Sequence, residues 1–219
     1  MQSNIFNLFS VPLVQIVHPQ PQILNTELKK LILEKESRGQ PEKNPSPSMR
    51  IPEQLFESKF DFFSQSEPCV VQLRKFCMSW LLRSIGEMSG YDAAQLGALE
   101  VNSHTWFHVT RKGGYFPLHN HPMASWSGVY CVAPGNAAPG NASDGAISFL
   151  NPMGLANMFV DAGNCQIKPP FSGKNFSLQL RAGELVLFPS YLFHEVFPYS
   201  GSEERITVAF NCWFTSANP

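Results

Sequence analysis

The second half of the chain is cut into short apolar segments by dense turn-forming sequence, and this pattern restricts the fold more than any other feature. Stretches such as A-P-G-N-A-A-P-G-N-A-S-D-G and K-P-P-F-S-G-K-N separate segments rich in β-branched and aromatic residues. Gly, Pro, Asn and Ser favour turns, and short strands at this spacing are typical of a β-sandwich or a jelly-roll barrel. The predicted strands are Val101–Thr110, Tyr115–His121, Ser127–Val132, Ala146–Leu150, Phe176–Leu180, Glu184–Phe188, Phe193–Phe197 and Arg205–Phe214.

The first hundred residues follow a different sequence pattern. A strand is expected over Phe9–His18, followed by a helix with its N-cap at Asn25 or Thr26. A second helix is expected from Glu67 onward, because its apolar residues recur at helical spacing. We find no internal repeat and no linker. The chain is therefore predicted to be one mainly-β domain over residues 1–219, in which two helices of residues 1–98 pack on one sheet of a jelly-roll core formed by residues 99–219.

Composition limits the classes of function. Hydrophobic residues make up 43% of the chain, enough for a sizeable core, while the net charge is only −1 and no basic cluster indicates direct nucleic-acid binding. Five scattered cysteines without a C-x-x-C pair argue against a disulfide framework. The N-terminus lacks a basic segment, and no apolar run is long enough to span a membrane. We expect a cytoplasmic protein, or one in another reducing compartment, with a homodimer as a possible assembly.

Three histidines form the most informative constellation. His119 and His121 stand two residues apart, so both imidazoles leave the same side of an extended backbone. His194 follows the predicted strand Glu184–Phe188 and a Pro turn. Three neutral imidazoles suit Fe, Cu, Ni or Zn and leave positions open for other ligands. A surface or core role is the better explanation for any single histidine, including His18 and His104, but the H-x-H pair with His194 favours a metal site.

Arg205 lies eleven residues after His194. A hairpin centred near Tyr199–Ser200 would place it directly opposite His194, with their Cβ atoms about 5 Å apart. A buried cation there needs an anion, and a bound carboxylate held bidentately by the guanidinium would supply one. The alternative is a solvated rim position paired with Glu203 or Glu204. On the first interpretation, the residues that share the face of Arg205 are Thr207, Ala209 and Asn211.

At this point the sequence resembles a known family. The blocks H-N-H-P-M-A-S-W-S-G-V-Y-C-V, I-S-F-L-N-P, G-E-L-V-L-F-P-S-Y-L-F-H-E-V-F-P and E-R-I-T-V-A-F-N are similar, in order and spacing, to a branch of the 2-oxoglutarate/Fe(II)-dependent dioxygenase superfamily. The preceding W-F-H-V-T-R-K-G-G-Y fits the same branch, so the resemblance covers about residues 101–214. It implies a double-stranded β-helix, the jelly-roll of this superfamily, enclosing Fe(II).

The resemblance also implies roles for individual residues. His119 falls on the first iron ligand, His194 on the distal histidine, and Arg205 on the residue that pairs with the far carboxylate of 2-oxoglutarate. The co-substrate would chelate iron through its 2-oxo acid end, and O2 would take the remaining position. Oxidative decarboxylation would then drive hydroxylation of an unidentified small molecule or protein side chain. Further co-substrate contacts are expected from His108, Thr110, Tyr130 and Asn211.

His121 departs from the superfamily pattern, because it stands where a carboxylate ligand is usual. A neutral third ligand leaves the iron site one charge more positive. Alternatively, His121 lies near the metal while water fills the third position. Asp144 or Asp161 could supply a carboxylate only if its loop folded into the site.

Two other functions are consistent with the residues. The spacing Gly183-x5-Pro189-x4-His194 resembles that of cupin enzymes, which include three-His thiol dioxygenases and metal-dependent isomerases. However, Tyr191 and Pro198 replace the Gly and Asn of that pattern, and no Glu follows His121 at the expected distance. The remaining alternative is a non-catalytic jelly-roll module whose histidine cluster is structural or binds Zn.

Overall fold

Two antiparallel sheets form the body of the computed structural model, which describes residues 3–47, 52–138, 140–156 and 159–216. The larger sheet has six strands in the order β1-β8-β5-β10-β3-β2, and the smaller has four in the order β4-β9-β6-β7. The strands are β1 (Val14–Val17), β2 (Leu55–Glu57), β3 (Leu99–Thr110), β4 (Phe116–His119), β5 (Trp126–Ala133), β6 (Ile147–Phe149), β7 (Phe176–Leu178), β8 (Glu184–Pro189), β9 (His194–Val196) and β10 (Arg205–Ser216).

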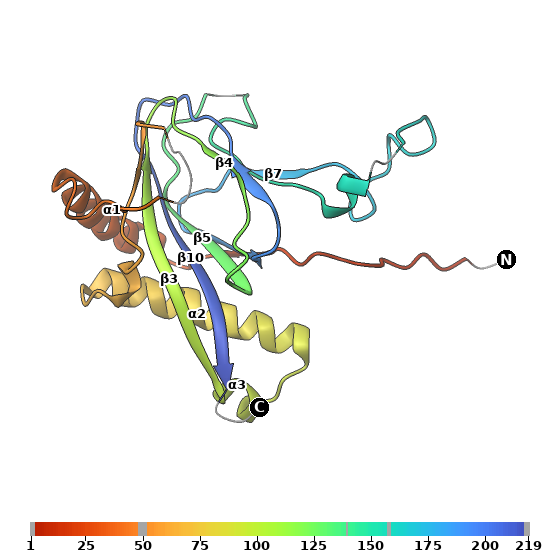
Figure 1. Cartoon of the computed structure of the whole chain (residues 1–219), viewed down its shortest axis with the longest axis horizontal. Helices are drawn as coiled ribbons and strands as arrows, with labels where there is room; N and C mark the ends of the chain where they lie inside the picture. Colours follow the sequence, from red (N-terminus) through yellow and green to blue (C-terminus); the bar gives the residue numbers. More distant parts are fainter. Residues whose placement is uncertain (1–2, 48–51, 139, 157–158, 217–219) are drawn as a thin grey trace.

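Helices α1 and α2 lie along one side of the larger sheet, while β4 and β7 of the smaller sheet lie on its other side (Figure 1). None of the helices in the described part of the chain is long and apolar enough to cross a membrane. The helical segments are α1 (Pro21–Ser37), α2 (Pro68–Ser89), α3 (Ala93–Gly97) and the short 3-10 turns η1 (Phe62–Ser64) and η2 (Pro152–Ala156).

Alternation along the strands of the larger sheet creates two separate apolar cores. Val208 and Phe210 of β10 pack in one cluster with Leu73 and Leu81 of α2, all of them fully buried. Cys131 of β5 belongs instead to a smaller cluster between the two sheets. Successive side chains of a strand point to opposite faces, so each central strand contributes to both cores.

The predicted mainly-β jelly-roll with two helices on one sheet is confirmed, and each of the eight predicted strands is present. The strand expected over Phe9–His18 is present but shorter, as β1, and β2 adds a further strand to the larger sheet. That the whole chain is one domain, divided near residue 98, stays a prediction.

The predicted start of the first helix is wrong. Helix α1 begins at Pro21, where the fixed φ and missing N–H of proline suit a first helical position. Asn25 is not a cap, because its side chain donates to the carbonyl of Val132 (2.9 Å) and accepts from the hydroxyl of Tyr130 (2.7 Å). Asn25 therefore joins α1 to β5 instead of beginning the helix.

The predicted hairpin between His194 and Arg205 is also wrong. Strand β9 belongs to the smaller sheet and β10 to the larger one, so the intervening chain crosses between sheets. Tyr199 fills this crossing: it is fully buried, and its hydroxyl donates to the carbonyl of Glu203 (2.8 Å). As a result, His194 faces His119 across β4 and β9, and Arg205 pairs with a residue of β3.

Close packing of β5 on β10 predicts a specific sensitivity. Gly128 lies opposite Phe210, and a Cβ at this position would overlap the phenyl ring. We expect Gly128→Ala to lower the free energy of unfolding by about 1–3 kcal/mol, the usual cost of overpacking a core. Urea titration followed by circular dichroism measures the change.

The matched control is Gly97→Ala in α3, where an added Cβ meets no atom within 4 Å. Its free energy of unfolding should stay within about 1 kcal/mol of the unsubstituted chain. Equal losses from both substitutions would contradict the importance of the Gly128–Phe210 contact.

Candidate active site

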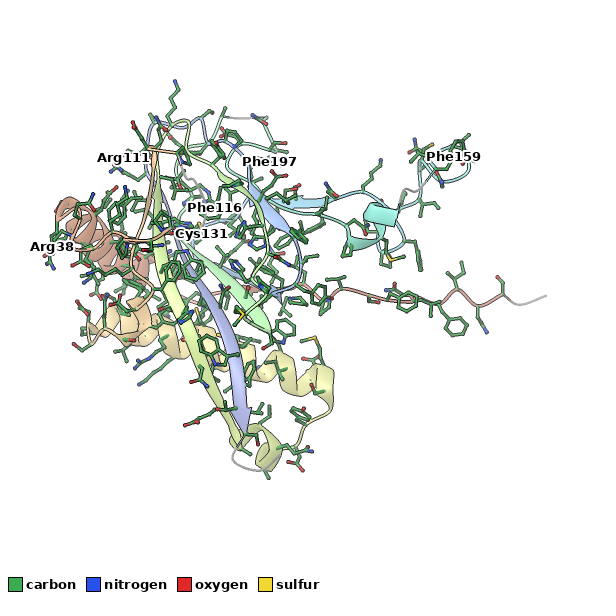
Figure 2. The ribbon with its side chains drawn as sticks, viewed as in Figure 1. Arg38, Arg111, Phe116, Cys131, Phe159 and Phe197 are labelled. Atoms are coloured by element: carbon green, nitrogen blue, oxygen red, sulfur yellow. The ribbon has the colours of Figure 1, made fainter. Side chains whose placement is uncertain are left out.

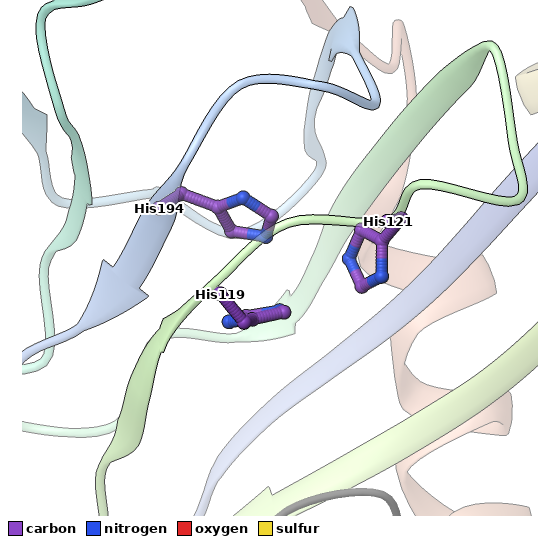
Figure 3. A group of neighbouring side chains, drawn as sticks. All are labelled: His119, His121 and His194. Atoms are coloured by element: carbon purple, nitrogen blue, oxygen red, sulfur yellow. The ribbon is translucent and has the colours of Figure 1, made fainter.

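Three histidines from two strands and a loop meet at one end of the smaller sheet. His119 ends β4 and stands directly opposite His194, the first residue of β9. His121 follows in the loop, where its backbone N–H donates to the carbonyl of Ser190 (2.9 Å). The potential ligand atoms of the three side chains lie within 4.8 Å of one another. Figure 3 shows the three rings gathered around one common space.

Backbone carbonyls orient two of the rings. Nδ1 of His119 lies 2.8 Å from the carbonyl of Pro117, and Nδ1 of His194 lies 2.9 Å from that of Leu192. A carbonyl oxygen can only accept, so each Nδ1 carries the hydrogen and each Nε2 keeps its lone pair. Metal-binding histidines are commonly held in this way. For His121, neither ring nitrogen has a hydrogen-bond partner among the described residues.

The environment keeps all three imidazoles neutral. Burial, together with the charge of its histidine neighbours, lowers the pKa of His194 to about 3. The same two causes lower the pKa of His121 to about 4, and burial lowers the pKa of His119. At pH 7 each ring can therefore donate a lone pair. Three neutral nitrogen donors at this separation suit a divalent transition metal, so these residues fit an iron ion.

Aromatic side chains surround the cluster. The ring centroid of Phe188 lies 4.8 Å from that of His194, and the centroid of Phe116 lies 4.6 Å from that of His119. Phe116 belongs to the buried core of the molecule, and Figure 2 shows it far from the projecting segment that carries Phe159. This apolar surround limits solvent access and lowers the local dielectric, which strengthens interactions with a bound charge.

Arg205 lines the same cavity as the three histidines. The residue is only 6% exposed, and its guanidinium has neither a hydrogen bond nor an ion pair within the described ranges. Burial accordingly lowers the pKa of Arg205. The rim alternative is wrong, because Glu204 pairs with Lys29 and Arg111 instead. An uncompensated buried cation is costly, so this position is suited to an anionic ligand.

Of the other predicted site residues, the structure brings two into the cavity. His108 of β3 and Asn211 of β10 line it, and Asn211 accepts a hydrogen bond from the hydroxyl of Ser127 (2.8 Å). Thr110 is buried beyond His108 and does not line the cavity. Tyr130 points to the opposite face of β5, where its hydroxyl binds Asn25. The predicted co-substrate contact is therefore wrong for Tyr130, and the cavity lining does not support it for Thr110.

Neither aspartate considered as a third ligand reaches the histidines. Asp144 accepts hydrogen bonds from the backbone N–H and the hydroxyl of Ser200. Asp161 accepts one from the backbone N–H of Gly163. Among the described residues, the cluster of potential ligands consists of the three histidines alone.

A buried carboxylate behind His108 was not predicted. Glu57 of β2 is 4% exposed, and its Oε2 lies 3.0 Å from Nε2 of His108. Its other oxygen accepts from Nδ2 of Asn44 (2.7 Å). Burial opposes ionisation, but the hydrogen bonds from His108 and Asn44 outweigh it, so the pKa of Glu57 is lowered. No local pattern marks Glu57, because its role arises from the pairing of β2 with β3.

Comparison with solved structures finds similar folds. A prolyl-4-hydroxylase from Pseudomonas putida is 18% identical, with a TM-score of 0.56 over 94% of this chain and 93% of its own. A Trichoplax adhaerens prolyl hydroxylase, solved with a hypoxia inducible factor peptide fragment, is 12% identical, with a TM-score of 0.60 over 92% and 83%. HygX from Streptomyces hygroscopicus, solved with nickel and 2-oxoglutarate, is 12% identical, with a TM-score of 0.60 over 95% and 84%. At these identities the likeness concerns the fold alone.

Sequence comparison is more specific. Among curated proteins, none matches the chain. Residues 104–211 match the family model described as "Putative 2OG-Fe(II) oxygenase". This segment begins in β3, ends in β10, and contains the three histidines, His108, Arg205 and Asn211. The match confirms the resemblance to 2OG-Fe(II) oxygenases that the sequence predicted.

Proposed function

We propose that this protein is an Fe(II)- and 2-oxoglutarate-dependent oxygenase whose iron is held by His119, His121 and His194. The observation that carries the proposal is the combination of three neutral, converging imidazoles with a buried arginine that has no counter-ion in the described chain. A metal and an anionic ligand are both required to complete such a site. The oxidised substrate is proposed to be a small molecule or a protein side chain.

When bound, Fe(II) and 2-oxoglutarate supply the oxidising chemistry, in which O2 converts the diacid to succinate and CO2 while a substrate C–H bond is hydroxylated. The chain's own residues bind and orient. Arg205 holds the far carboxylate of the diacid through its planar guanidinium. The carbonyls behind His119 and His194 fix the direction of the two Nε2 lone pairs. Phe116 and Phe188 exclude water from the cluster.

The charge of the site supports binding of a dianion. Fe(II), three neutral imidazoles and Arg205 together carry three positive charges, and the diacid brings two negative ones. No carboxylate ligand offsets the remainder, so attraction for the diacid is stronger than in a site with an acidic third ligand. The cavity itself has a free volume of about 40 Å³. Because this is space for only a few water molecules, side chains must move apart as the diacid enters.

A reducing compartment is proposed for the protein. All five cysteines are free, and four of them are buried, including Cys77 and Cys212. Burial raises the pKa of Cys212 to about 12, which keeps its thiol protonated and unreactive. A homodimer stays a prediction.

The proposed ligand set predicts a graded loss of metal affinity. Replacing His119 or His194 by Ala should weaken Fe(II) binding by more than about 100-fold, since loss of an outer partner alone costs about 10–100-fold. His121→Ala should cost less, because no hydrogen bond fixes its ring. Anaerobic isothermal titration with Fe(II) measures all three variants.

His18→Gln is the matched control, since His18 lies outside the cluster, in contact with Phe76 of α2. It should bind Fe(II) with the affinity of the unsubstituted protein. If His121→Ala lost as much affinity as His119→Ala, the proposed ranking of the ligands would be wrong. Tight Zn(II) binding without any Fe(II) binding would favour a non-catalytic module.

Arg205 provides the test of the co-substrate. Arg205→Gln should weaken 2-oxoglutarate binding at least about 30-fold, because truncating one partner of a buried charge pair costs about 2–5 kcal/mol. Anaerobic titration of the Fe(II) protein, followed by the metal-to-ligand charge-transfer band, gives the affinity. The affinity of Arg205→Lys for 2-oxoglutarate should lie between those of the unsubstituted protein and Arg205→Gln, because lysine keeps the charge but not the bidentate geometry.

The control is Arg111→Gln, which removes a half-exposed guanidinium that pairs with Glu36 on the surface. It should leave the titration unchanged. Succinate formation under O2 provides an independent measure of co-substrate turnover. An Arg205→Gln protein that still binds 2-oxoglutarate normally would favour a three-His enzyme of another class.

A further inference from the structure

An open groove adjoins the histidine cavity on the side of His121. Its volume is about 200 Å³, five times that of the cavity beside it. His121 and Asn211 line both spaces, so a molecule in the groove touches the edge of the proposed iron site. The groove is therefore placed to hold the substrate that is oxidised, and this inference rests on the proposed function.

Aromatic rings form one wall of the groove. His104 of β3 lies opposite Asn211 of β10, and Trp213 lies on the same face two residues further along. The centroids of His104 and Trp213 are 4.9 Å apart, with the rings inclined at 67°. This inclination makes an aromatic corner, in which a third ring can stack on one neighbour and present its edge to the other. β3 and β10 run side by side along this part of the molecule (Figure 1).

Further rings continue this wall toward the metal cluster. Phe60 lies 6.3 Å from His104 and 4.7 Å from Trp106, measured between ring centroids. Trp106 in turn lies 6.0 Å from His121. The series of ring contacts connects the aromatic corner of the open groove with a proposed iron ligand.

Two asparagine amides supply uncharged polar groups in the groove. None of the eight described residues that line it is an Asp, Glu, Lys or Arg. Asn120 donates through Nδ2 to the carbonyl of Tyr191 (3.3 Å), and Asn211 accepts at Oδ1 from Ser127. These bonds leave Oδ1 of Asn120 as an acceptor and Nδ2 of Asn211 as a donor. Such a pair matches a neutral group that both donates and accepts, such as an amide.

We propose that the groove binds the oxidised substrate through an uncharged planar ring that carries an amide-like group. Its volume is sufficient, because a cavity of about 150 Å³ accommodates a benzene ring. Met123 borders the groove and is 89% exposed, so its flexible thioether can close over a bound ring. A charged substituent would lose hydration here without finding an opposite charge.

The test uses 4-fluorobenzamide as the probe and the full-length protein, with binding followed by ¹⁹F NMR. Trp213→Ala and His104→Ala should each weaken probe binding several-fold, up to about tenfold, which is the usual range for an aromatic pair. Trp213→Phe and His104→Phe keep a ring and should retain most of the affinity. Trp80→Ala is the matched control, because Trp80 lies on α2 under the guanidinium of Arg83.

Competition against the same probe tests the chemical class. Benzamide should displace it at least several-fold more effectively than benzoate, which adds a charge, or cyclohexanecarboxamide, which lacks the flat ring. The proposal is overturned if the probe does not bind, if Trp213→Ala binds it like the unsubstituted protein, or if either competitor equals benzamide. Circular dichroism and thermal unfolding of each variant exclude loss of fold as the cause.

The result does not depend on the iron chemistry, because probe binding requires neither Fe(II) nor 2-oxoglutarate. If 2-oxoglutarate does not bind in the anaerobic titration but the probe binds normally, the oxygenase function is rejected and the groove is still supported as a site for an uncharged ring. If the probe does not bind but 2-oxoglutarate binds normally, only the proposed ring-binding role of the groove is rejected.

Discussion

The register of β10 is the constraint on which the rest of the structure depends. This strand pairs along its full length with β3 and on its other edge with β5. One face buries Val208 and Phe210 against the helices, while the other carries Arg205 and Asn211 into the cavity. Because side chains alternate with a period of two, a slip of one residue would exchange the faces and place the cation in the apolar core. Stability and the site therefore rest on the same pairing.

The site is built from neutral ligands and an unbalanced cation. Burial keeps His119, His121 and His194 uncharged, and Arg205 has no carboxylate beside it in the described chain. The nearby carboxylate of Glu57 is already engaged by His108 and Asn44. The negative charge that balances Arg205 must consequently come from a bound ligand, so the net charge of the site changes when that ligand binds. The groove beyond His121 has the opposite property, since none of its described lining residues is an Asp, Glu, Lys or Arg that could pair with a charged molecule.

Much of this arrangement was predictable from local patterns. Each strand of the second half was marked by alternation and by turns. The H-x-H pair correctly indicated a histidine cluster, although β4 ends at His119 and His121 lies in the loop that follows, not on the same strand face. The face shared by Arg205 and Asn211 was also correct, since it follows from the period of the strand alone. Tyr130 was misplaced because the sequence does not say which face of β5 meets the helices. Glu57 was missed because it approaches His108 only through pairing with a distant strand.

By itself, the sequence determined the periodicities, the residue types and their spacing: a jelly-roll pattern, two imidazoles on one strand, a third after a Pro turn, and an arginine on the last strand. Tertiary structure decided what each of them meets. The chain after β9 crosses to the other sheet around Tyr199, so His194 faces His119 and Arg205 stands apart. Local patterns carry no information on such crossings, because the choice between a hairpin and a change of sheet depends on packing between residues far apart in the chain.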